Sequence, residues 1–259
     1  MNTRNMLKTT LLLAALALAA CSTPPPPPKV AQSEPALDPI ARNVKERIEA
    51  RGFRWGAPLY VRIFKTENVL EAWMQKEGGH YELYQRYPIC VYSGELGPKV
   101  KRGDKQAPEG FYKVGLRALN PNSQYHLSFN LGYPNAYDRA HGYTGDYLMV
   151  HGDCVSVGCY AMGDRQIEEI YTLVGISLQY GQKEVPVHIF PFHLTPENLM
   201  RHGGHRWASF WQMLKPGYDY FEAYRYPPVI DVVNKRYQVN YDKTAEQQMA
   251  GNARNLAQQ

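Results

Sequence analysis

One segment of the sequence is unusually rich in reactive residues: His151-Gly152-Asp153-Cys154-Val155-Ser156-Val157-Gly158-Cys159-Tyr160-Ala161-Met162. It follows an apolar segment, Tyr147 to Val150, which predicts a buried strand. It precedes a helix predicted to start at the N-cap Asp164 and to end near Gly181. The helical spacing is carried by Ile167, Ile170, Tyr171, Val174 and Leu178. A loop between a rigid strand and a long helix is a favoured place for catalytic side chains.

The residue types in this loop suit nucleophilic catalysis. Cys159 follows Gly158, whose lack of a side chain lets a substrate carbonyl approach backbone N–H groups that form an oxyanion hole. Cys159 also precedes the predicted helix closely, and we expect the positive helix end to favour its thiolate. His151 is the candidate base that takes the thiol proton. The alternative is that both side chains are packed and inert.

The same residues carry a resemblance to a known family. His151-Gly152 and the block Ser156-Val157-Gly158-Cys159-Tyr160 resemble the signature of the L,D-transpeptidase catalytic domain, the YkuD-type cell-wall cysteine enzymes. Ala107-Pro108-Glu109-Gly110-Phe111 resembles the family's Thr-Pro-x-Gly-x turn. The segment from Leu127 to Asp138, with Gly132-Tyr133-Pro134-Asn135, resembles the YafK-like branch of exported murein L,D-transpeptidases. The resemblance covers roughly Leu59 to Phe192.

Two features depart from the common family pattern. Val157 stands where the common form has a His, and only eight positions separate His151 from Cys159. The branch that this chain resembles shares both features. The base is therefore still assigned to His151 and the nucleophile to Cys159, while the shorter loop changes the walls of the substrate cleft.

The resemblance implies acyl transfer on peptidoglycan stem peptides. Cys159 would attack the carbonyl at the L-centre of a diaminopimelate residue, and N–H groups near Gly158 and Cys159 would stabilise the oxyanion. Gly152 would hold His151 through its carbonyl, Ser156 would hydrogen-bond within the loop, and Tyr133 would line the cleft or pack in the core. No cofactor and no metal are required. An amine acceptor gives transpeptidation and water gives hydrolysis, and the residues leave both open.

The flanking sequence predicts an α+β fold with a mixed β core and flanking helices. Short strands dominate the middle of the chain, and the C-terminal third is expected to be mostly helical. Helical spacing also predicts helices at Leu37 to Arg51 and Glu67 to Lys76. Further helices are expected from Pro196 to Met200 and from Trp207 to Leu214. We expect one catalytic domain over 37–242, followed by a polar tail over 243–259.

The N-terminal segment indicates export. Arg4 and Lys8 precede a ten-residue apolar stretch that is too short to span a bilayer, so 1–20 reads as a signal peptide. The sequence Leu18-Ala19-Ala20-Cys21 resembles a bacterial lipobox, which implies lipidation of Cys21. The Ser after that Cys resembles the outer-membrane default, so we expect a lipid anchor on the periplasmic side of the envelope. The remainder of 21–36 contains five consecutive prolines, which favour an extended tether.

Cys90 and Cys154 remain to be explained. An oxidising compartment permits a disulfide between them. We expect both to be unpaired buried thiols, with a Cys90–Cys154 bridge as the alternative. A Cys154–Cys159 bridge would silence the enzyme.

Composition excludes some classes of protein. Of 259 residues, 44% are hydrophobic and 20% are charged, an ordinary globular balance that rules out general disorder. The net charge of +5 falls to +3 when Arg4 and Lys8 are removed with the signal peptide, so no nucleic-acid partner is expected. The sequence gives no oligomeric state.

Two alternatives from other classes remain. A zinc site would draw ligands from His141, His151, Cys154, Cys159, His202 and His205, but His202-Gly203-Gly204-His205 lacks the Glu of a metalloprotease helix. The other alternative is a non-catalytic peptidoglycan-binding lipoprotein that has kept the shape of an enzyme.

Overall fold

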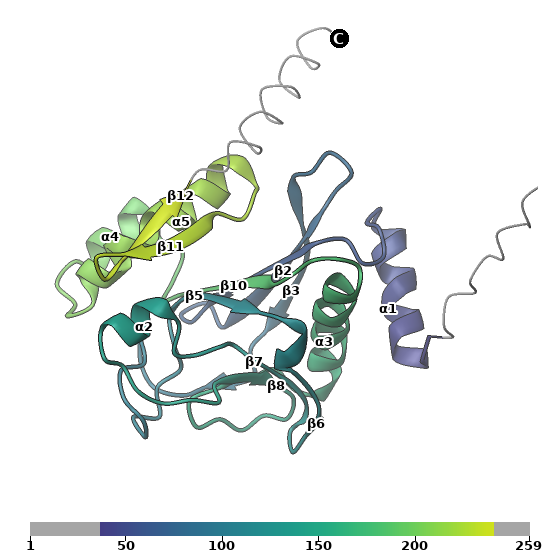
Figure 1. Ribbon diagram of the computed structural model, residues 1–259, viewed down its shortest axis with the longest axis horizontal. Coiled ribbons are helices and arrows are strands. Elements are labelled where there is room, and N and C mark those ends of the chain that lie inside the picture. Colours follow the sequence, from purple (N-terminus) through teal and green to yellow (C-terminus); the bar gives the residue numbers. More distant parts are fainter. Residues whose placement is uncertain (1–36, 241–259) are drawn as a thin grey trace, which may run out of the picture. The chain divides into compact units, whose positions relative to one another are not determined.

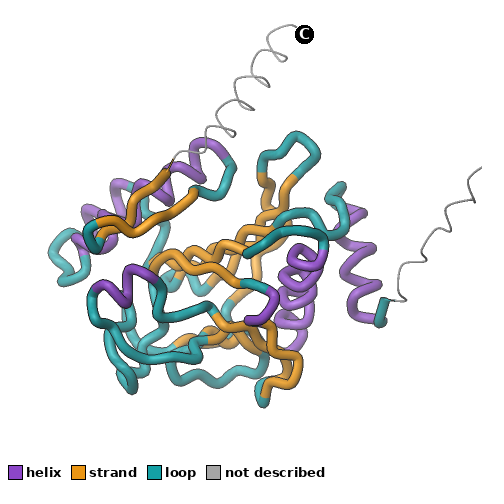
Figure 2. The backbone as a smooth tube through the Cα atoms, viewed as in Figure 1, coloured by secondary structure: helices purple, strands orange, loops and turns teal. Residues whose placement is uncertain are grey.

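The computed structural model describes residues 37–240 of the chain. The predicted signal peptide, the lipidation site Cys21, the proline tether and the polar tail lie outside these residues. The structure is α+β, as predicted, with two five-stranded sheets, a C-terminal hairpin and several helices (Figures 1 and 2).

The first sheet forms the centre of the fold. Its strand order is β3-β2-β1-β10-β5, with β1 and β10 parallel and the other neighbours antiparallel. The strands are β1 (Leu59–Phe64), β2 (Val69–Gln75), β3 (Tyr81–Pro88), β5 (Gly110–Val114) and β10 (Val185–Phe190). Both β1 and β10 are rich in apolar residues because elements cover both faces of this sheet.

The second sheet carries the stretch that was singled out in the sequence. Its order is β4-β9-β8-β7-β6, and only β8 and β9 run parallel. The strands are β4 (Val91–Tyr92), β6 (Leu119–Ser123), β7 (His126–Asn130), β8 (Met149–His151) and β9 (Tyr160–Ala161). The loop between β8 and β9 therefore holds the residues from Gly152 to Cys159.

Helices lie against both sheets. They are α1 (Pro39–Ala50), the 3-10 turn η1 (Leu116–Ala118), α2 (Ala136–Ala140), α3 (Asp164–Gln179), α4 (Pro196–Arg201) and α5 (Ala208–Tyr224). The side chain of Asp38 caps α1 by accepting from the N–H of Ala41 at 2.8 Å. Within the described residues, no helix combines the length and apolar content needed to cross a bilayer.

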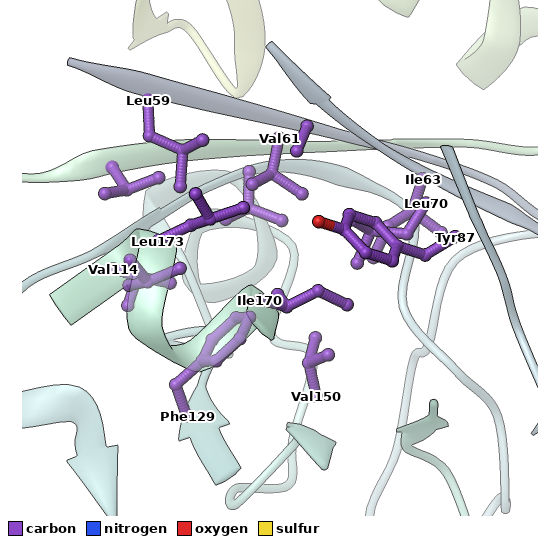
Figure 3. Close-up of a cluster of buried hydrophobic side chains, with 14 of the residues drawn as sticks. Leu59, Val61, Ile63, Leu70, Tyr87, Val114, Phe129, Val150, Ile170 and Leu173 are labelled. Atoms are coloured by element: carbon purple, nitrogen blue, oxygen red, sulfur yellow. The ribbon is translucent and has the colours of Figure 1, made fainter. Parts of the chain in front are cut away.

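The main core lies between the two sheets, around α3. Ile170 and Leu173 of α3 point between Val61 of β1 and Phe129 of β7, as Figure 3 shows. Burial on this apolar face fixes α3 against both sheets. A second cluster, around Trp211 and Phe64, packs α5 on the opposite face of the first sheet.

One expectation about the elements is wrong and another is not confirmed. The segment predicted as a helix over Glu67 to Lys76 is the strand β2, because both of its faces are buried and no alternation of polar and apolar residues remains. The mostly helical C-terminal third is not confirmed, since its described part, up to residue 240, also contains β10 and the hairpin formed by β11 (Val229–Val233) and β12 (Arg236–Asn240).

Candidate active site

The parallel pair β8 and β9 brings His151 and Cys159 to one face of the second sheet. Val150 pairs with Tyr160, and His151 pairs with Ala161. Continued by one residue, this register places Met149 opposite Cys159. The two candidate residues are then diagonal neighbours on one face, with Cα atoms roughly 8 Å apart from strand spacing and rise. Their side chains therefore project from the same face of the sheet.

His151 is held in a defined tautomer. Its side chain is 2% exposed, and Nδ1 lies 2.6 Å from the carbonyl oxygen of Gly152. Because a carbonyl only accepts, Nδ1 carries the proton and Nε2 keeps its lone pair. Burial lowers the pKa of His151 below its ordinary value of 6.5, while the Gly152 carbonyl and the charge of Asp153 oppose the shift. The ring is therefore neutral near pH 7 and able to accept a proton at Nε2.

Cys159 is the free cysteine of the described residues, and it is half-buried. Its sulfur accepts from the N–H of Met149 at 3.4 Å and lies 3.9 Å from the carbonyl oxygen of Tyr147. Burial raises the thiol pKa above its ordinary value of 9.0, against the Met149 N–H and the positive charge of Lys99, which lower it. The resting sulfur is therefore a thiol.

The expected thiolate is not favoured at rest, because burial outweighs the groups that lower the pKa of Cys159. Helix α3 begins at Asp164, five residues after Cys159, with Gly163 as its N-cap. The field of a helix terminus falls off within its first turn. The prediction that the helix end favours a thiolate is therefore wrong, and burial dominates the thiol pKa. Asp164 caps the preceding loop instead, because its Oδ1 accepts from the N–H of Asp153 at 2.7 Å.

Both backbone N–H groups expected to form the oxyanion hole already have partners. The Cys159 N–H donates to Ser156 Oγ at 3.0 Å, and the Gly158 N–H donates to Ser93 Oγ. Ser156 Oγ in turn donates to the Cys159 carbonyl oxygen at 2.8 Å, which confirms the expected bond within the loop. The two hydroxyls are 3.3 Å apart. The single hydroxyl proton of Ser156 is already donated to the Cys159 carbonyl oxygen, so the Ser93 hydroxyl donates to Ser156 Oγ.

This hydroxyl pair defines the conformation of the nucleophile loop. Gly158 has a φ of +108°, a backbone region in which a side chain is strained, so glycine is required there.

Sequence reasoning missed Ser93. It follows β4, 66 positions before Cys159, and no local pattern links the two. Only the pairing of β4 with β9 brings them together.

Gly152 is required for close packing. A Cβ at this position would lie 2.7 Å from both Asp164 Oδ1 and the Tyr125 carbonyl oxygen. Its N–H donates to the carbonyls of Tyr125 and Leu127, each at 3.0 Å. The end of β8 is thereby fastened to the β6–β7 turn. The expected contact from its carbonyl to His151 is present.

Cys90 and Cys154 form a disulfide, with Cα atoms 5.5 Å apart. The expectation that they are unpaired thiols is wrong, and the alternative bridge is the one found. Cys90 follows β3, and its N–H donates to the carbonyl of Ala161 at 2.9 Å, which brings it beside the β8–β9 loop. The bridge closes a separation of 64 residues and fixes the loop that precedes the nucleophile.

Tyr133 belongs to the core and does not line an open cleft. It is 4% exposed, and its hydroxyl lies 3.3 Å and 3.4 Å from the carbonyl oxygens of Lys99 and Thr144. Of the two roles considered from sequence, core packing is the one observed. Exposed apolar side chains beside the nucleophile come instead from Tyr147 and Val157, each 74% exposed.

A buried ion pair anchors the segment 93–107. Lys65 Nζ lies 3.1 Å from Glu109 Oε1, and both side chains are fully buried. The ammonium also donates to the carbonyls of Gly97 and Ala107, at 2.9 Å and 2.7 Å. Glu109 lies in the Ala107-to-Phe111 turn, so this turn is a structural anchor whose Lys partner sequence reasoning did not find.

The geometry does not support the zinc alternative. Among residues 37–240, no three His, Cys, Asp or Glu side chains gather as a metal site requires. His202 stacks on Phe192 with ring centroids 4.4 Å apart, and His205 stacks on Trp211 at 4.6 Å. Cys154 is committed to its disulfide.

Comparison with known proteins identifies the family of the chain. Residues 58–206 match the L,D-transpeptidase catalytic domain (YkuD). The chain is 48% identical over 208 residues to the putative L,D-transpeptidase YafK of Escherichia coli K12, which covers 80% of this chain and 82% of that protein.

Solved structures are more distant. The cell shape determining protein Pgp2 of Campylobacter jejuni has a TM-score of 0.43 and 18% identity, covering 83% of this chain and 78% of that one. Bd1075 of Bdellovibrio bacteriovorus has a TM-score of 0.37 and 18% identity, covering 71% and 83%. These two values support no conclusion about activity. On the sequence matches, the chain belongs to the L,D-transpeptidase catalytic domain family.

Proposed function

We propose that this protein is a murein L,D-transpeptidase in which Cys159 is the nucleophile and His151 is the general base. One observation carries the proposal: the β8–β9 register places a free, half-buried cysteine on the same face as a histidine whose Nδ1 is held by a carbonyl, leaving Nε2 as the acceptor. Family membership supplies the substrate class, peptidoglycan stem peptides.

The first half-reaction forms a thioester. The Cys159 thiol gives its proton to His151 Nε2 as its sulfur attacks the carbonyl carbon at the L-centre of a diaminopimelate residue. The C–N bond then breaks, and the imidazolium returns the proton to the departing amine. Both groups are neutral at rest, so the proton has to pass from Cys159 Sγ to His151 Nε2 within the catalytic cycle.

Oxyanion stabilisation follows from the hydroxyl pair. The N–H groups of Gly158 and Cys159 already point at Ser93 and Ser156. The developing oxyanion takes the place of a hydroxyl at one of these donors, which the loop already holds in a fixed orientation. Ser93 and Ser156 thus hold the backbone N–H groups of Gly158 and Cys159 in place in the resting enzyme.

The second half-reaction decides the outcome. An amine acceptor attacking the thioester gives a new L,D-type link, and water gives hydrolysis. Hydrolysis would release a cross-link or a lipoprotein attached to peptidoglycan, and it is the alternative that we retain within the same chemistry. A non-catalytic peptidoglycan-binding lipoprotein is the remaining alternative.

The direct test uses residues 22–259 and purified sacculi. Wild type and Cys159→Ala are incubated with the sacculi, the glycan is digested, and the stems are analysed by mass spectrometry. Cys159-dependent diaminopimelate–diaminopimelate links identify a transpeptidase, and Cys159-dependent release of tripeptides or lipoprotein remnants identifies a hydrolase. No difference between the two proteins on any sacculus would refute the enzymatic proposal and leave the binding lipoprotein.

We also propose that Cys21 is lipidated and that the domain is held on the periplasmic side of the outer membrane. The lipobox-like sequence before Cys21 supports this. Labelled fatty acid should be incorporated into the full chain, and Cys21→Ser should abolish incorporation. Fractionation of the envelope distinguishes the outer from the inner membrane, and label retained by Cys21→Ser would contradict the proposal.

A further inference from the structure

The turn between β6 and β7 lies against the end of β8. Ser123 pairs with His126 across the turn, and β7 pairs with β8 on its other side (Figure 1). Tyr125, inside the turn, donates its N–H to Ser123 Oγ at 3.1 Å. Its carbonyl oxygen accepts from the Gly152 N–H at 3.0 Å. The turn is thus bound to the residue that follows the candidate base.

A second contact attaches the same turn to α3. His126 has a φ of +66°, and its Nε2 lies 2.9 Å from Glu168 Oε1 on α3. Both side chains are partly exposed, so the pair adds little stability, but it joins the turn to the helix. The turn is therefore attached to both β8 and α3, and the Tyr125 side chain starts from a defined backbone position.

The ring of Tyr125 covers one face of the His151 imidazole. The ring centroids are 4.7 Å apart, and the two planes are inclined by 34°. His151 is almost completely buried, whereas Tyr125 is 43% exposed. The tyrosine ring therefore lies between the imidazole and solvent on that face.

Gly152 connects the two contacts of the imidazole. Its carbonyl oxygen holds His151 Nδ1 at the ring edge, and its N–H binds the backbone of Tyr125, whose ring covers the face. The edge contact determines which nitrogen carries the proton. The χ2 torsion of a histidine is soft, so one hydrogen bond at the edge leaves the ring free to tilt. The contact on the face restricts this tilt.

The tyrosine ring acts on the imidazole in two opposing ways. Excluding water disfavours the imidazolium and lowers its pKa. The negative face of an aromatic ring attracts a cation within about 6 Å and raises that pKa. Burial is the largest cause of the lowered pKa of His151, and it outweighs the Gly152 carbonyl and the charge of Asp153, which raise it. We therefore expect the exclusion of water to be the stronger effect.

We propose that Tyr125 is a positioning residue that keeps water from His151 and fixes the plane in which Nε2 accepts the proton. Tyr125 acts through His151 and transfers no proton of its own. The inference rests on the proposed function, because the role exists only if His151 is the general base. Its first test is made on the resting protein and needs no substrate.

NMR titration of His151 measures the shielding directly. Residues 22–259 are labelled with 13C in the histidine rings, and the His151 signal is assigned by its loss in His151→Gln. Tyr125→Ala removes the ring and admits water, so the pKa of His151 should rise toward 6.5. Tyr125→Phe keeps the ring and should titrate as wild type does.

The matched control is Tyr224→Ala at the end of α5. Tyr224 is also 43% exposed, and its ring packs against another aromatic ring, that of Tyr220. This variant loses as much side chain as Tyr125→Ala does, but far from β8 in the fold, since α5 packs on the first sheet. It should leave the pKa of His151 unchanged.

Kinetics test the orienting role. On soluble stem peptides from digested sacculi, Tyr125→Ala should lower kcat about tenfold while KM stays within about twofold of wild type. The acid limb of kcat/KM should move to higher pH by the same interval as the NMR pKa. Tyr125→Phe should retain both wild-type values, which a role for the hydroxyl would not allow.

Four outcomes would overturn the inference. An unchanged pKa in Tyr125→Ala would show that the ring shields nothing, and a lower pKa would show that attraction for the imidazolium dominates. Equal losses in Tyr125→Phe and Tyr125→Ala would assign the effect to the hydroxyl, and an equal loss in Tyr224→Ala would make it general. Failure of the proposed function is distinguishable, because it appears as equal activity of wild type and Cys159→Ala.

Discussion

At the scale of single residues, burial sets the charge state of the candidate catalytic pair. It lowers the pKa of His151 below 6.5 and raises that of Cys159 above 9.0, so both shifts favour the neutral forms. Many cysteine enzymes instead hold a thiolate beside an imidazolium at rest. This site is expected to differ because its cysteine is not at a helix terminus.

The pH dependence follows directly from these signs. Alkylation of Cys159 by iodoacetamide should rise with a midpoint above pH 9.0, because the thiolate reacts and burial opposes its formation. The acid limb of kcat/KM should lie below pH 6.5, because His151 stays neutral to lower pH than an exposed histidine. Cys159→Ala supplies the blank for alkylation elsewhere. An alkylation midpoint below pH 7 would indicate an ion pair and contradict this account.

Ser93 should act through the Gly158 peptide group. Ser93→Ala removes the acceptor of the Gly158 N–H, so the donor is less well oriented and kcat should fall about tenfold while KM changes little. Ser93→Thr, which keeps a hydroxyl, should restore part of the rate. The control is Ser177→Ala in α3. The buried Ser177 hydroxyl donates to the Leu173 carbonyl within the same helix and does not belong to the nucleophile loop. An unchanged or higher kcat in Ser93→Ala would show that the hydroxyl competes with the oxyanion.

At the scale of elements, the end of β8 depends on a glycine that lets two chain segments touch. Gly152→Ala places a methyl group 2.7 Å from the Tyr125 carbonyl oxygen, so the strand end must move and the carbonyl that holds His151 moves with it. We expect a loss of about 1–3 kcal/mol in unfolding free energy and a larger proportional loss of activity.

Urea unfolding and a sacculus assay measure the two effects of Gly152→Ala. The control is Gly175→Ala within α3, where a Cβ would come no closer than 3.9 Å to its nearest neighbour. That change should stabilise the helix by up to about 1 kcal/mol. If Gly152→Ala matched wild type in both assays, close packing at this position would be unimportant.

Elements whose faces differ in polarity were the ones that could be predicted from the sequence. The helix α3 agrees closely with its expected range, because it has one clear apolar face. The strand β2 was mistaken for a helix because residues from both neighbouring layers bury it completely. The helix α5 was expected to stop at Leu214 but continues through Pro216 to Tyr224, where tertiary packing of Tyr220 and Phe221 outweighs the proline.

The residues of the candidate site also differ in whether the sequence alone could reveal them. His151 and Cys159 could be singled out because their motif is contiguous in the chain. Ser93, Lys65 and Glu109 could not be linked to the site, because their contacts arise only when β4 and the first sheet come together.

At the scale of the whole molecule, the Cys90–Cys154 disulfide links distant segments of the chain. Closing a separation of 64 residues reduces the entropy of the unfolded chain, which corresponds to about 4 kcal/mol of stability. The double variant Cys90→Ser/Cys154→Ser should therefore unfold at lower denaturant concentration. Its activity should fall because the loop before Cys159 loses its attachment.

Reduction of the wild type should lower its stability to denaturant and its activity to the values of the double variant. Reductant should change neither quantity in the double variant. Equal denaturation midpoints for the oxidised wild type and the double variant would contradict a stabilising bridge.

The bridge also determines how many free thiols a thiol reagent detects in each molecule. A preparation that begins after Cys21 contains three cysteines, of which the disulfide consumes two and leaves Cys159. Titration with a chromogenic disulfide reagent therefore detects one equivalent of thiol per competent molecule. The titration needs no substrate. A reading below one equivalent measures nucleophiles lost to oxidation, and a reading near three measures molecules that were never oxidatively matured.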